Sequence, residues 1–325
     1  MKILHITNAY PNTNEKIKGI FVKEQIDSIR LVSGNQVDVM IINAREEGWV
    51  SYVKSLFKCI RVRNNYDIIH CHHVLTGLIA SIVFPRRKLI LSYMNDGNNN
   101  LKGKLRYLSP LVMSYLNAFF IWKIFKVRVP KSAKHNSFQV QNGVDLNFFR
   151  PNDKREAKEY FGFSPDKVLL LHVSANSMRH EKRIDIFYRI ISELESRGLR
   201  IEPFILNNLD RELIPLAFSA SDFYILTSDF EGSPNALKEA MACGTIPIAR
   251  DVGSVRQILG KEFEFLCLNS VDEKDYANVI QRICENNSIN SFSAALREQI
   301  VEKELDSISV AKRINDIYSK IREYG

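Results

Sequence analysis

The stretch Asp222–Arg250 reads DFYILTSDFEGSPNALKEAMACGTIPIAR and decides the fold. Its first part, Phe223–Leu226, is a short apolar and aromatic run that predicts a buried strand. Gly232 interrupts the chain after this run, and Ser233 is a good helix N-cap. Pro234 then stands at the first helical position, where its missing N–H group costs nothing, so a helix is expected to begin here.

A helix and a second strand complete the stretch. Residues 235–243 are mostly strong helix formers, and Gly244 supplies the stop after them. Thr245–Ile248 is predicted to return as a strand, near a sheet edge or at the strand start because it contains Pro247. The order strand, loop, helix, strand within about thirty residues indicates a parallel crossover.

Two carboxylates lie on this crossover, Glu231 in the loop before the helix and Glu239 inside it. The helix N-terminus between them presents free backbone N–H groups and a partial positive charge, which attract a phosphate. The turn at Gly232 and Ser233 lets a ligand approach the backbone closely. Because a carboxylate can accept hydrogen bonds from two neighbouring hydroxyls, the two glutamates fit a nucleotide that carries a sugar through phosphate.

Residues 231–244, with Pro247 and Asp251–Ile258 after them, resemble the E-x7-E region of the retaining glycosyltransferases of family 4. The resemblance covers fourteen consecutive positions. It implies the GT-B fold, an α/β class with two Rossmann-like doubly wound domains that face a cleft. The alternative is an ordinary crossover helix with solvated glutamates, which leaves the Gly-Ser-Pro entry to the helix unexplained.

Composition is that of a globular protein with a large core. The 325 residues suggest about two domains, and 45% are hydrophobic and 25% charged. We expect a cytoplasmic protein, because the first residues do not resemble a signal peptide and no apolar run is long enough to span a membrane. Five scattered cysteines without a C-x-x-C pair argue against structural zinc and against a disulfide framework.

Charge is unevenly distributed along the chain. Residues 1–150 hold 22 basic and 9 acidic side chains, whereas residues 151–325 hold 23 and 28. Eleven of the cations and only one acid lie between Arg86 and Lys134, around an apolar helix predicted from Ser109–Pro110 to about Phe125. Either this is a buried helix with a solvated basic rim, or the segment lies on an anionic membrane. Nucleic acid is not expected, since no nucleic-acid-binding motif accompanies the charge.

The N-terminal half begins as a doubly wound sheet, with a strand at residues 2–7, a helix from Gly19 to about Leu31, and a strand at residues 37–42. The resemblance places a loop glycine at the interdomain cleft, and Gly19 is the candidate, although a plain helix-entry glycine fits equally. After a strand at residues 88–93, the acceptor and cleft candidates are Asn95, Asp96 and Gly97, where the family usually has a histidine loop.

Residues 66–73 are predicted to form a strand that runs into a loop, and they contain three nearly adjacent histidines. His70 and His72 would share one face of the strand, but no carboxylate or thiol cluster is spaced to complete a metal site. The resemblance makes His70 structural. We therefore expect no metal at these histidines.

The two expected domains meet at the Val140–Pro151 segment, which resembles the family's N-G-V-D…F-x-P hinge. We predict an N-terminal acceptor-binding domain at residues 1–150, with a C-terminal helix at about 307–325 packing back on it. Residues 151–306 would form the domain that binds the nucleotide-sugar donor.

A basic site for the donor diphosphate is implied by the resemblance. Lys182 keeps the family's lysine, but Ser174 and Ala175 stand where glycine and arginine are usual. Arg179 or Arg183 could replace the missing charge. A lysine needs no special geometry to act on phosphate, so Lys182 is the first candidate.

The function expected from these residues is retaining, hexosyltransferase-type transfer of a sugar from a UDP- or GDP-sugar. Lys182 and Glu231 are the catalytic candidates, because Lys182 would neutralise charge on the leaving diphosphate and Glu231 would hold the donor sugar. Glu239 would bind the ribose, and the remaining donor contacts would come from Gly232, Ser233, Pro234, Asn235 and Arg179. No D-x-D motif occurs, so we expect neither a metal ion nor a cofactor, only the nucleotide sugar as co-substrate.

A lipid-linked glycan is the expected acceptor, in polysaccharide or glycolipid assembly at the inner face of a membrane to which the protein attaches peripherally. Two alternatives remain open at this point. A nucleotide-sugar 2-epimerase would turn over without an acceptor, and a non-catalytic nucleotide-sugar-binding module would bind donor without releasing nucleotide. A dinucleotide oxidoreductase is disfavoured, since no G-x-G-x-x-G follows any predicted strand.

Overall fold

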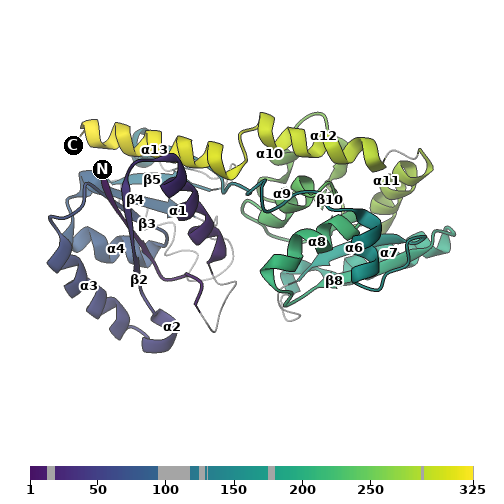
Figure 1. Cartoon of the computed structure of the whole chain (residues 1–325), viewed down its shortest axis with the longest axis horizontal. Coiled ribbons are helices and arrows are strands. Elements are labelled where there is room, and N and C mark those ends of the chain that lie inside the picture. Colours follow the sequence, from purple (N-terminus) through teal and green to yellow (C-terminus); the bar gives the residue numbers. More distant parts are fainter. Residues whose placement is uncertain are drawn as a thin grey trace. The chain divides into compact units, whose positions relative to one another are not determined.

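The computed structural model describes residues 1–12, 19–93, 118–123, 129, 131–174, 180–286 and 289–324. The chain divides into two compact units, one formed by residues 1–143 with 307–325 and the other by residues 144–306. Each unit contains one sheet whose strands all run parallel, covered by helices (Figure 1). No helix within the described ranges is long and apolar enough to cross a membrane.

The N-terminal unit has a six-stranded sheet of order β2-β1-β3-β4-β5-β6. Its strands are β1 (Lys2–Thr7), β2 (Gln36–Ile41), β3 (Ile68–Cys71), β4 (Leu89–Tyr93), β5 (Phe119–Trp122) and β6 (Ser137–Gln139). Its helices are α1 (Ile20–Val32), α2 (Ala44–Glu47), α3 (Val50–Val62), α4 (Val74–Val83) and α13 (Ser307–Tyr324), with short 3-10 turns at Arg86–Lys88 and Lys131–Asn136.

Alternation along the strands separates two cores in this unit. One face carries Ile3 and Ile68 against α1 and α13, which pack side by side (Figure 1). The other face carries Leu4 and Ile69. Near-continuous burial of β1, β3 and β4 is typical of a parallel sheet covered on both faces.

Gly19 is the N-cap of α1 and has a left-handed backbone with φ of 66°. A Cβ atom at this position would lie 2.1 Å from the carbonyl oxygen of Ala9, in the loop after β1. Only glycine therefore fits, because both the backbone conformation and the close approach of two segments exclude a side chain.

The helix predicted at residues 109–125 is wrong in its last part, because Phe119–Trp122 forms strand β5 between β4 and β6. Aromatic and β-branched side chains favour a strand here, and two paired neighbours override the apolar helical pattern. Lys123, predicted to flank the basic surface, is buried and donates a hydrogen bond of 2.7 Å to Gln25 Oε1. Residues 101–117 and 124–128, including Lys102, Lys104 and Arg106, lie outside the described ranges.

The C-terminal unit has a five-stranded sheet of order β11-β10-β9-β7-β8. Its strands are β7 (Val168–Val173), β8 (Ile201–Leu206), β9 (Phe223–Leu226), β10 (Ile246–Arg250) and β11 (Cys267–Leu268). Its α-helices are α6 (Lys154–Tyr160), α7 (Ile184–Ser196), α8 (Ile214–Ala220), α9 (Asn235–Ala242), α10 (Val255–Leu259), α11 (Glu273–Glu285) and α12 (Ile289–Glu302). Short 3-10 turns lie at His180–Lys182, Arg211–Leu213 and Glu264–Leu266.

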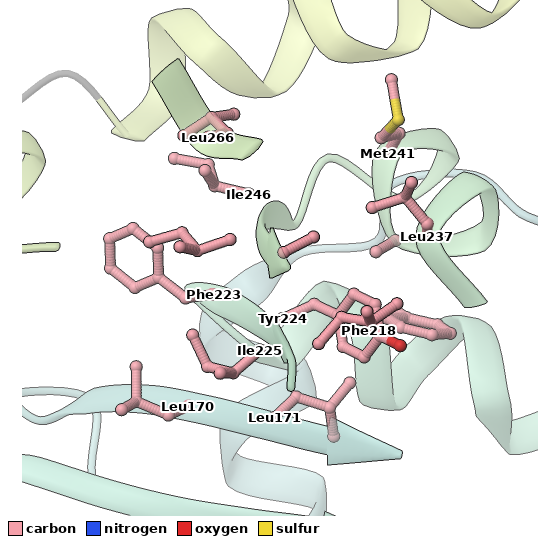
Figure 2. Close-up of a cluster of buried hydrophobic side chains, with 14 of the residues drawn as sticks. Leu170, Leu171, Phe218, Phe223, Tyr224, Ile225, Leu237, Met241, Ile246 and Leu266 are labelled. Atoms are coloured by element: carbon pink, nitrogen blue, oxygen red, sulfur yellow. The ribbon is translucent and has the colours of Figure 1, made fainter. Parts of the chain in front are cut away.

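Strand β9 lies at the centre of the core of this unit (Figure 2). Its Phe223, Tyr224 and Ile225 pack with Leu171 of β7 and Leu237 of α9. The predicted strand, helix and strand of the Asp222–Arg250 stretch are thus confirmed, and their buried side chains fix the loops at the strand ends.

Two details of this crossover differ from expectation or refine it. Pro234, not Ser233, is the N-cap of α9, because its extended ψ of 112° places it outside the helix. Pro247 lies in β10 opposite Tyr224 of β9, while the short strand β11 pairs only with Ala249 and Arg250. Because β11 does not extend to Pro247, no strand on that side requires a backbone N–H donor from this residue. A proline therefore fits here, one strand from the sheet edge.

The division between the units falls after Gly143, whereas the sequence suggested Arg150 and Pro151. Val144 and Phe149 belong to the core of the C-terminal unit, which places this segment there. The Val144 N–H also donates to the Leu305 carbonyl at 3.0 Å. The two places where the chain passes from one unit to the other, after residues 143 and 306, therefore lie beside each other.

Candidate functional site

The candidate site lies where the strands of the C-terminal sheet end. In parallel α/β units, ligands bind outside the carboxyl ends of the strands. Residues 227–234 follow β9 and lead into α9, while Lys182 and Arg183 lead from the β7 side into α7. The predicted donor residues Glu231, Gly232, Ser233 and Pro234 are all in the first of these segments.

Lys182 and Glu231, the two predicted catalytic residues, form an ion pair with 2.6 Å between Nζ and Oε1. Their side chains are only 21% and 16% exposed. The Ser228 hydroxyl donates to the same Oε1 at 2.8 Å. The structure therefore brings the predicted pair together and gives the carboxylate a defined orientation.

Hydrogen bonds between the two segments hold this pair in place. The Thr227 hydroxyl donates to the carbonyls of Lys182 and Arg183, at 2.8 and 3.0 Å. The Asp229 N–H donates to the Glu181 carbonyl at 2.8 Å. Since these bonds involve the backbone, the position of Lys182 depends on the loop after β9 and not only on its own 3-10 turn.

Gly253 supports the other side of the Glu231 loop. It has φ of 55°, and a Cβ atom there would lie 2.2 Å from the carbonyl oxygen of Gly232 and 2.4 Å from that of Glu231. The next residue, Ser254, donates its N–H to the Gly232 carbonyl at 2.9 Å. The entry to α10 thus touches the backbone that carries Glu231, and a side chain at Gly253 would displace it.

Glu239 points from α9 to a cation that the sequence analysis missed. Arg211 Nη1 lies 3.1 Å from Glu239 Oε1, and both side chains are largely buried. The guanidinium also lies over the Phe149 ring, 4.7 Å from its centroid, a cation–π arrangement. Arg211 follows β8, and its position after a predicted strand end was the only sequence signal that could have identified it.

Tyr224 links the two glutamates electrostatically. Burial raises the pKa of its phenol well above 10, and the negative charges of Glu231 and Glu239 raise it further. The phenol therefore stays neutral. Tyr224 adds a buried, uncharged side chain to the strand that precedes the Glu231 loop.

The start of α9 carries the remaining donor candidates. Lys238 is buried and donates to the Ser233 hydroxyl at 3.2 Å. Burial lowers the pKa of Lys238 to about 7, against the opposing effect of Glu239. The Oδ1 atom of Asn235 is buried and accepts no hydrogen bond from any described residue.

Arg183, one of the two predicted replacements for the missing arginine, is bound by acids. Its guanidinium makes two hydrogen bonds of 2.9 Å to Asp185 and one of 3.3 Å to Asp229. Arg250 also pairs with Asp229. The other predicted replacement, Arg179, lies outside the described residues, as do the acceptor candidates Asn95, Asp96 and Gly97.

Three histidines in the N-terminal unit form a buried cluster, of which the sequence analysis had found only two. His5 lies opposite His70 because β1 pairs in parallel with β3, and ligand atoms of His5, His70 and His72 lie within 4.8 Å of one another. His5 Nδ1 and His72 Nε2 are 2.7 Å apart. Burial lowers the pKa of all three imidazoles, that of His5 to about 3, so they are neutral at physiological pH.

The cluster is tied to the C-terminal helix. His70 Nδ1 and the Tyr318 hydroxyl of α13 are 2.6 Å apart, and His70 Nε2 and the Ser92 hydroxyl are 2.7 Å apart. Both ring nitrogens of His70 are thus engaged, which fits the expected structural role. That no metal binds at these histidines stays a prediction.

Comparison with known proteins identifies relatives of both halves. Residues 183–304 match the family model described as Glycosyl transferases group 1. The chain is 27% identical over 305 residues to UDP-Gal:alpha-D-GlcNAc-diphosphoundecaprenol alpha-1,3-galactosyltransferase from Escherichia coli, covering 81% of this chain and 76% of the relative.

Solved structures match the whole fold. A sucrose-phosphate synthase from Thermosynechococcus elongatus has a TM-score of 0.75 and 17% identity, with 100% of both chains covered. Anabaena Alr3699/HepE in complex with UDP-glucose has a TM-score of 0.68 and 15% identity, covering 98% of this chain and 100% of that one.

The two parallel-sheet α/β units and these neighbours establish a two-domain, Rossmann-like GT-B fold. The family model and the named relative together support a glycosyltransferase. They favour neither a 2-epimerase nor a non-catalytic binding module. The family model covers the segment from Arg183 through α12, which includes Glu231, Glu239 and Arg211.

Proposed function

We propose that the protein is a retaining, hexosyltransferase-type glycosyltransferase that moves a sugar from a nucleotide-diphosphate sugar to a lipid-linked glycan acceptor. The C-terminal unit would bind the donor and the N-terminal unit the acceptor. The donor would be a UDP- or GDP-sugar. UDP-glucose bound to the Anabaena neighbour and the UDP-sugar donor in the name of the Escherichia coli relative support UDP.

One observation carries the proposal. Glu231 and Glu239 flank the N-terminus of α9, and each carboxylate is paired with a cation, Lys182 and Arg211 respectively. The paired cations fix the positions of these carboxylate oxygens, which can accept hydrogen bonds from the hydroxyls of a sugar and a ribose. The helix start between them offers N–H groups to phosphate.

Lys182 would neutralise charge on the leaving diphosphate. In sugar transfer, negative charge grows on the leaving diphosphate, and a preorganised cation stabilises it more in the transition state than in the ground state. The diphosphate would compete with Glu231 for the Lys182 ammonium, leaving that carboxylate available to the donor sugar. The resemblance to family 4 implies a front-face reaction without a protein nucleophile, so we assign no general base.

We propose that the reaction needs no metal ion, because the sequence lacks a D-x-D motif and Lys182 would supply positive charge to the diphosphate. We place the protein at the inner face of a membrane, in polysaccharide or glycolipid assembly. The supporting finding is the acceptor in the name of the Escherichia coli relative, a GlcNAc-diphosphoundecaprenol.

A donor screen followed by turnover assays tests the proposal. Nucleotide sugars that bind should raise the melting temperature by mass action. The stabilising donor, mixed with an undecaprenyl-diphosphate glycan, should release nucleotide and yield a product with retained anomeric configuration, with or without EDTA. Conversion of the donor without acceptor would indicate an epimerase, binding without nucleotide release a non-catalytic module, and loss of activity in EDTA a metal-dependent reaction.

A further inference from the structure

Helix α3 of the N-terminal unit differs from an ordinary surface helix in which of its side chains are buried. Its buried side chains are small, since Ser51, Ser55 and Cys59 all lie against the body of the unit. The two serine hydroxyls donate to carbonyls within the helix or just before it, at 2.7 Å each. A helix of a globular protein normally turns its large apolar side chains inward.

Tyr52 and Val62 pack partly against the core, but four other large apolar side chains, from the N-cap Trp49 onward, are exposed to solvent. They form the α3 stripe, which is Trp49 at 75% exposed, Val53 at 41%, Phe57 at 61% and Ile60 at 45%. At about 100° per residue, these four lie within an arc of roughly 80°, on the opposite side of the helix from the buried serines. Contiguous exposed apolar side chains of this size mark an interaction surface.

Basic side chains border the stripe. Residues 48–66 contain four basic and no acidic residues. Lys54, Lys58 and Arg61 project beside the stripe and are exposed. Lys54 pairs with Glu47 at 2.6 Å, whereas Lys58 and Arg61 make no ion pair with any residue that the structure describes. A helix face of this kind fits a partner whose outer layer is anionic and whose interior is apolar.

We propose that α3 docks this unit on an anionic phospholipid bilayer, with the helix lying in the interface plane and the stripe inserted among the acyl chains. Apolar aromatic and aliphatic residues on one face and lysine or arginine beside them are the pattern of interfacial helices. The exposed cations of the border, Lys54, Lys58 and Arg61, would repel those of a second copy, and they match lipid phosphates. The inference rests on the peripheral membrane attachment in the proposed function and assigns the surface that makes it.

Helix α3 is a different surface from the 86–134 segment that the sequence had indicated, and that segment stays a prediction. Lys123 of that segment is buried against Gln25, and Lys102, Lys104 and Arg106 lie outside the described residues. Helix α3 packs on α4 and also contacts α2 (Figure 1). Its Tyr52 hydroxyl accepts a hydrogen bond of 3.2 Å from Asn8 in the loop after β1, so docking would bring the carboxyl end of the sheet near the membrane.

Tryptophan fluorescence gives a direct readout, because the chain has only two tryptophans. Trp49 is exposed on the stripe and Trp122 is 5% exposed in the core, where it serves as an internal reference. Adding vesicles of phosphatidylglycerol and phosphatidylcholine to the full chain should shift the emission to shorter wavelength. Lipids brominated on the acyl chain should quench it. Trp49→Phe should bind the vesicles and lose both signals.

Two sets of variants test the surface in a vesicle sedimentation assay. Val53→Ser combined with Phe57→Ser should weaken binding at least tenfold, because both side chains lose apolar area that enters the bilayer. Replacing Lys54, Lys58 and Arg61 by Gln should weaken binding about a hundredfold at low salt, since each cation near an anionic surface contributes roughly a factor of five. High salt should abolish the difference.

Matched controls separate the surface from total charge and total hydrophobicity. Leu31→Ser removes an exposed leucine from α1, and Gln at Lys261, Lys274 and Lys312 removes three exposed charges elsewhere. Both controls should bind like the wild type, and all variants should keep the melting temperature and the thermal shift with nucleotide sugar.

Each outcome decides the inference. If the wild type binds anionic vesicles and the α3 variants do so equally, α3 is not the docking surface, although membrane attachment stands. If the wild type ignores anionic vesicles at low salt, both the inference and the proposed attachment fail, while donor binding remains separately measurable. Concentration-dependent dimerisation that the α3 variants abolish would assign the stripe to a second copy and overturn the proposal.

Discussion

The sharpest test of the site is Lys182→Ala, which breaks the ion pair with Glu231. If Lys182 stabilises charge on the leaving diphosphate, its loss should lower kcat by a factor of about 10²–10³, equal to roughly 2.7–4 kcal/mol of transition-state stabilisation. KM for the donor should rise much less, since the interaction strengthens toward the transition state. The fold should be retained.

The effect on stability follows from the geometry of the pair. Two unit charges about 4 Å apart attract by about 4 kcal/mol at the effective dielectric constant of a protein surface. Desolvation of a largely buried pair offsets most of this, and here the side chains keep 21% and 16% of their exposure. We therefore expect a coupling of about 1–2 kcal/mol, measured by a double-mutant cycle with Glu231→Gln. Each kcal/mol should move the melting temperature by about 2–4 °C for a unit of this size.

The assays are steady-state nucleotide release and chemical denaturation, with Lys167→Ala as the matched control. Lys167 pairs with Glu202 in the same unit at 3.9 Å and is 43% exposed, so its loss should cost under about 1 kcal/mol and leave kcat unchanged. A Lys182→Ala enzyme with unchanged kcat and raised KM would mean that the lysine binds ground state and transition state equally, which refutes the proposed role. Additive stability effects in the cycle would refute the coupling.

Three further outcomes are expected. Glu239→Ala should weaken donor binding by about 1.5–3 kcal/mol for each hydrogen bond lost, measured by calorimetry on the folded variant; unchanged affinity would show that Glu239 does not hold the ribose. Gly253→Ala should abolish donor binding, because its Cβ would strike the Glu231 and Gly232 carbonyls, whereas Gly162→Ala, with φ of 75° and nothing within 4 Å, should cost only the backbone strain and keep the affinity. Burial lowers the folded-state pKa of His5 from 6.5 to about 3, so the unfolded chain binds more protons between these values, and stability present above pH 6.5 is lost as pH falls, by up to about 1.4 kcal/mol per pH unit. Urea unfolding followed by Trp122 fluorescence should show a shallower loss between pH 6.5 and 5 for His5→Gln than for the wild type, and equal slopes would contradict the assignment.

The sequence by itself determined those helices and strands whose signals lie in a few neighbouring residues. The strand, helix and strand around Glu231 and Glu239 follow from apolar runs, a proline at the helix entry and a glycine after it. Most strands of both units were identified for the same reason, since a buried parallel strand is a compact apolar run bounded by turn residues. The resemblance named Lys182 and Glu231 as separate site residues, whereas the ion pair between them is seen only in the structure.

Tertiary structure alone decided the features that join distant parts of the chain. Arg211 meets Glu239 because the turn after β8 and helix α9, which follows β9, both come after strands of one parallel sheet, and His5 joins His70 because β1 and β3 pair in register. Strand pairing likewise made Phe119–Trp122 a strand, against an apolar pattern that suited a helix. Periodicity in a sequence shows that a helix has two faces but not which of them is covered. Only the structure shows that the α3 stripe is exposed while Ser51, Ser55 and Cys59 are buried.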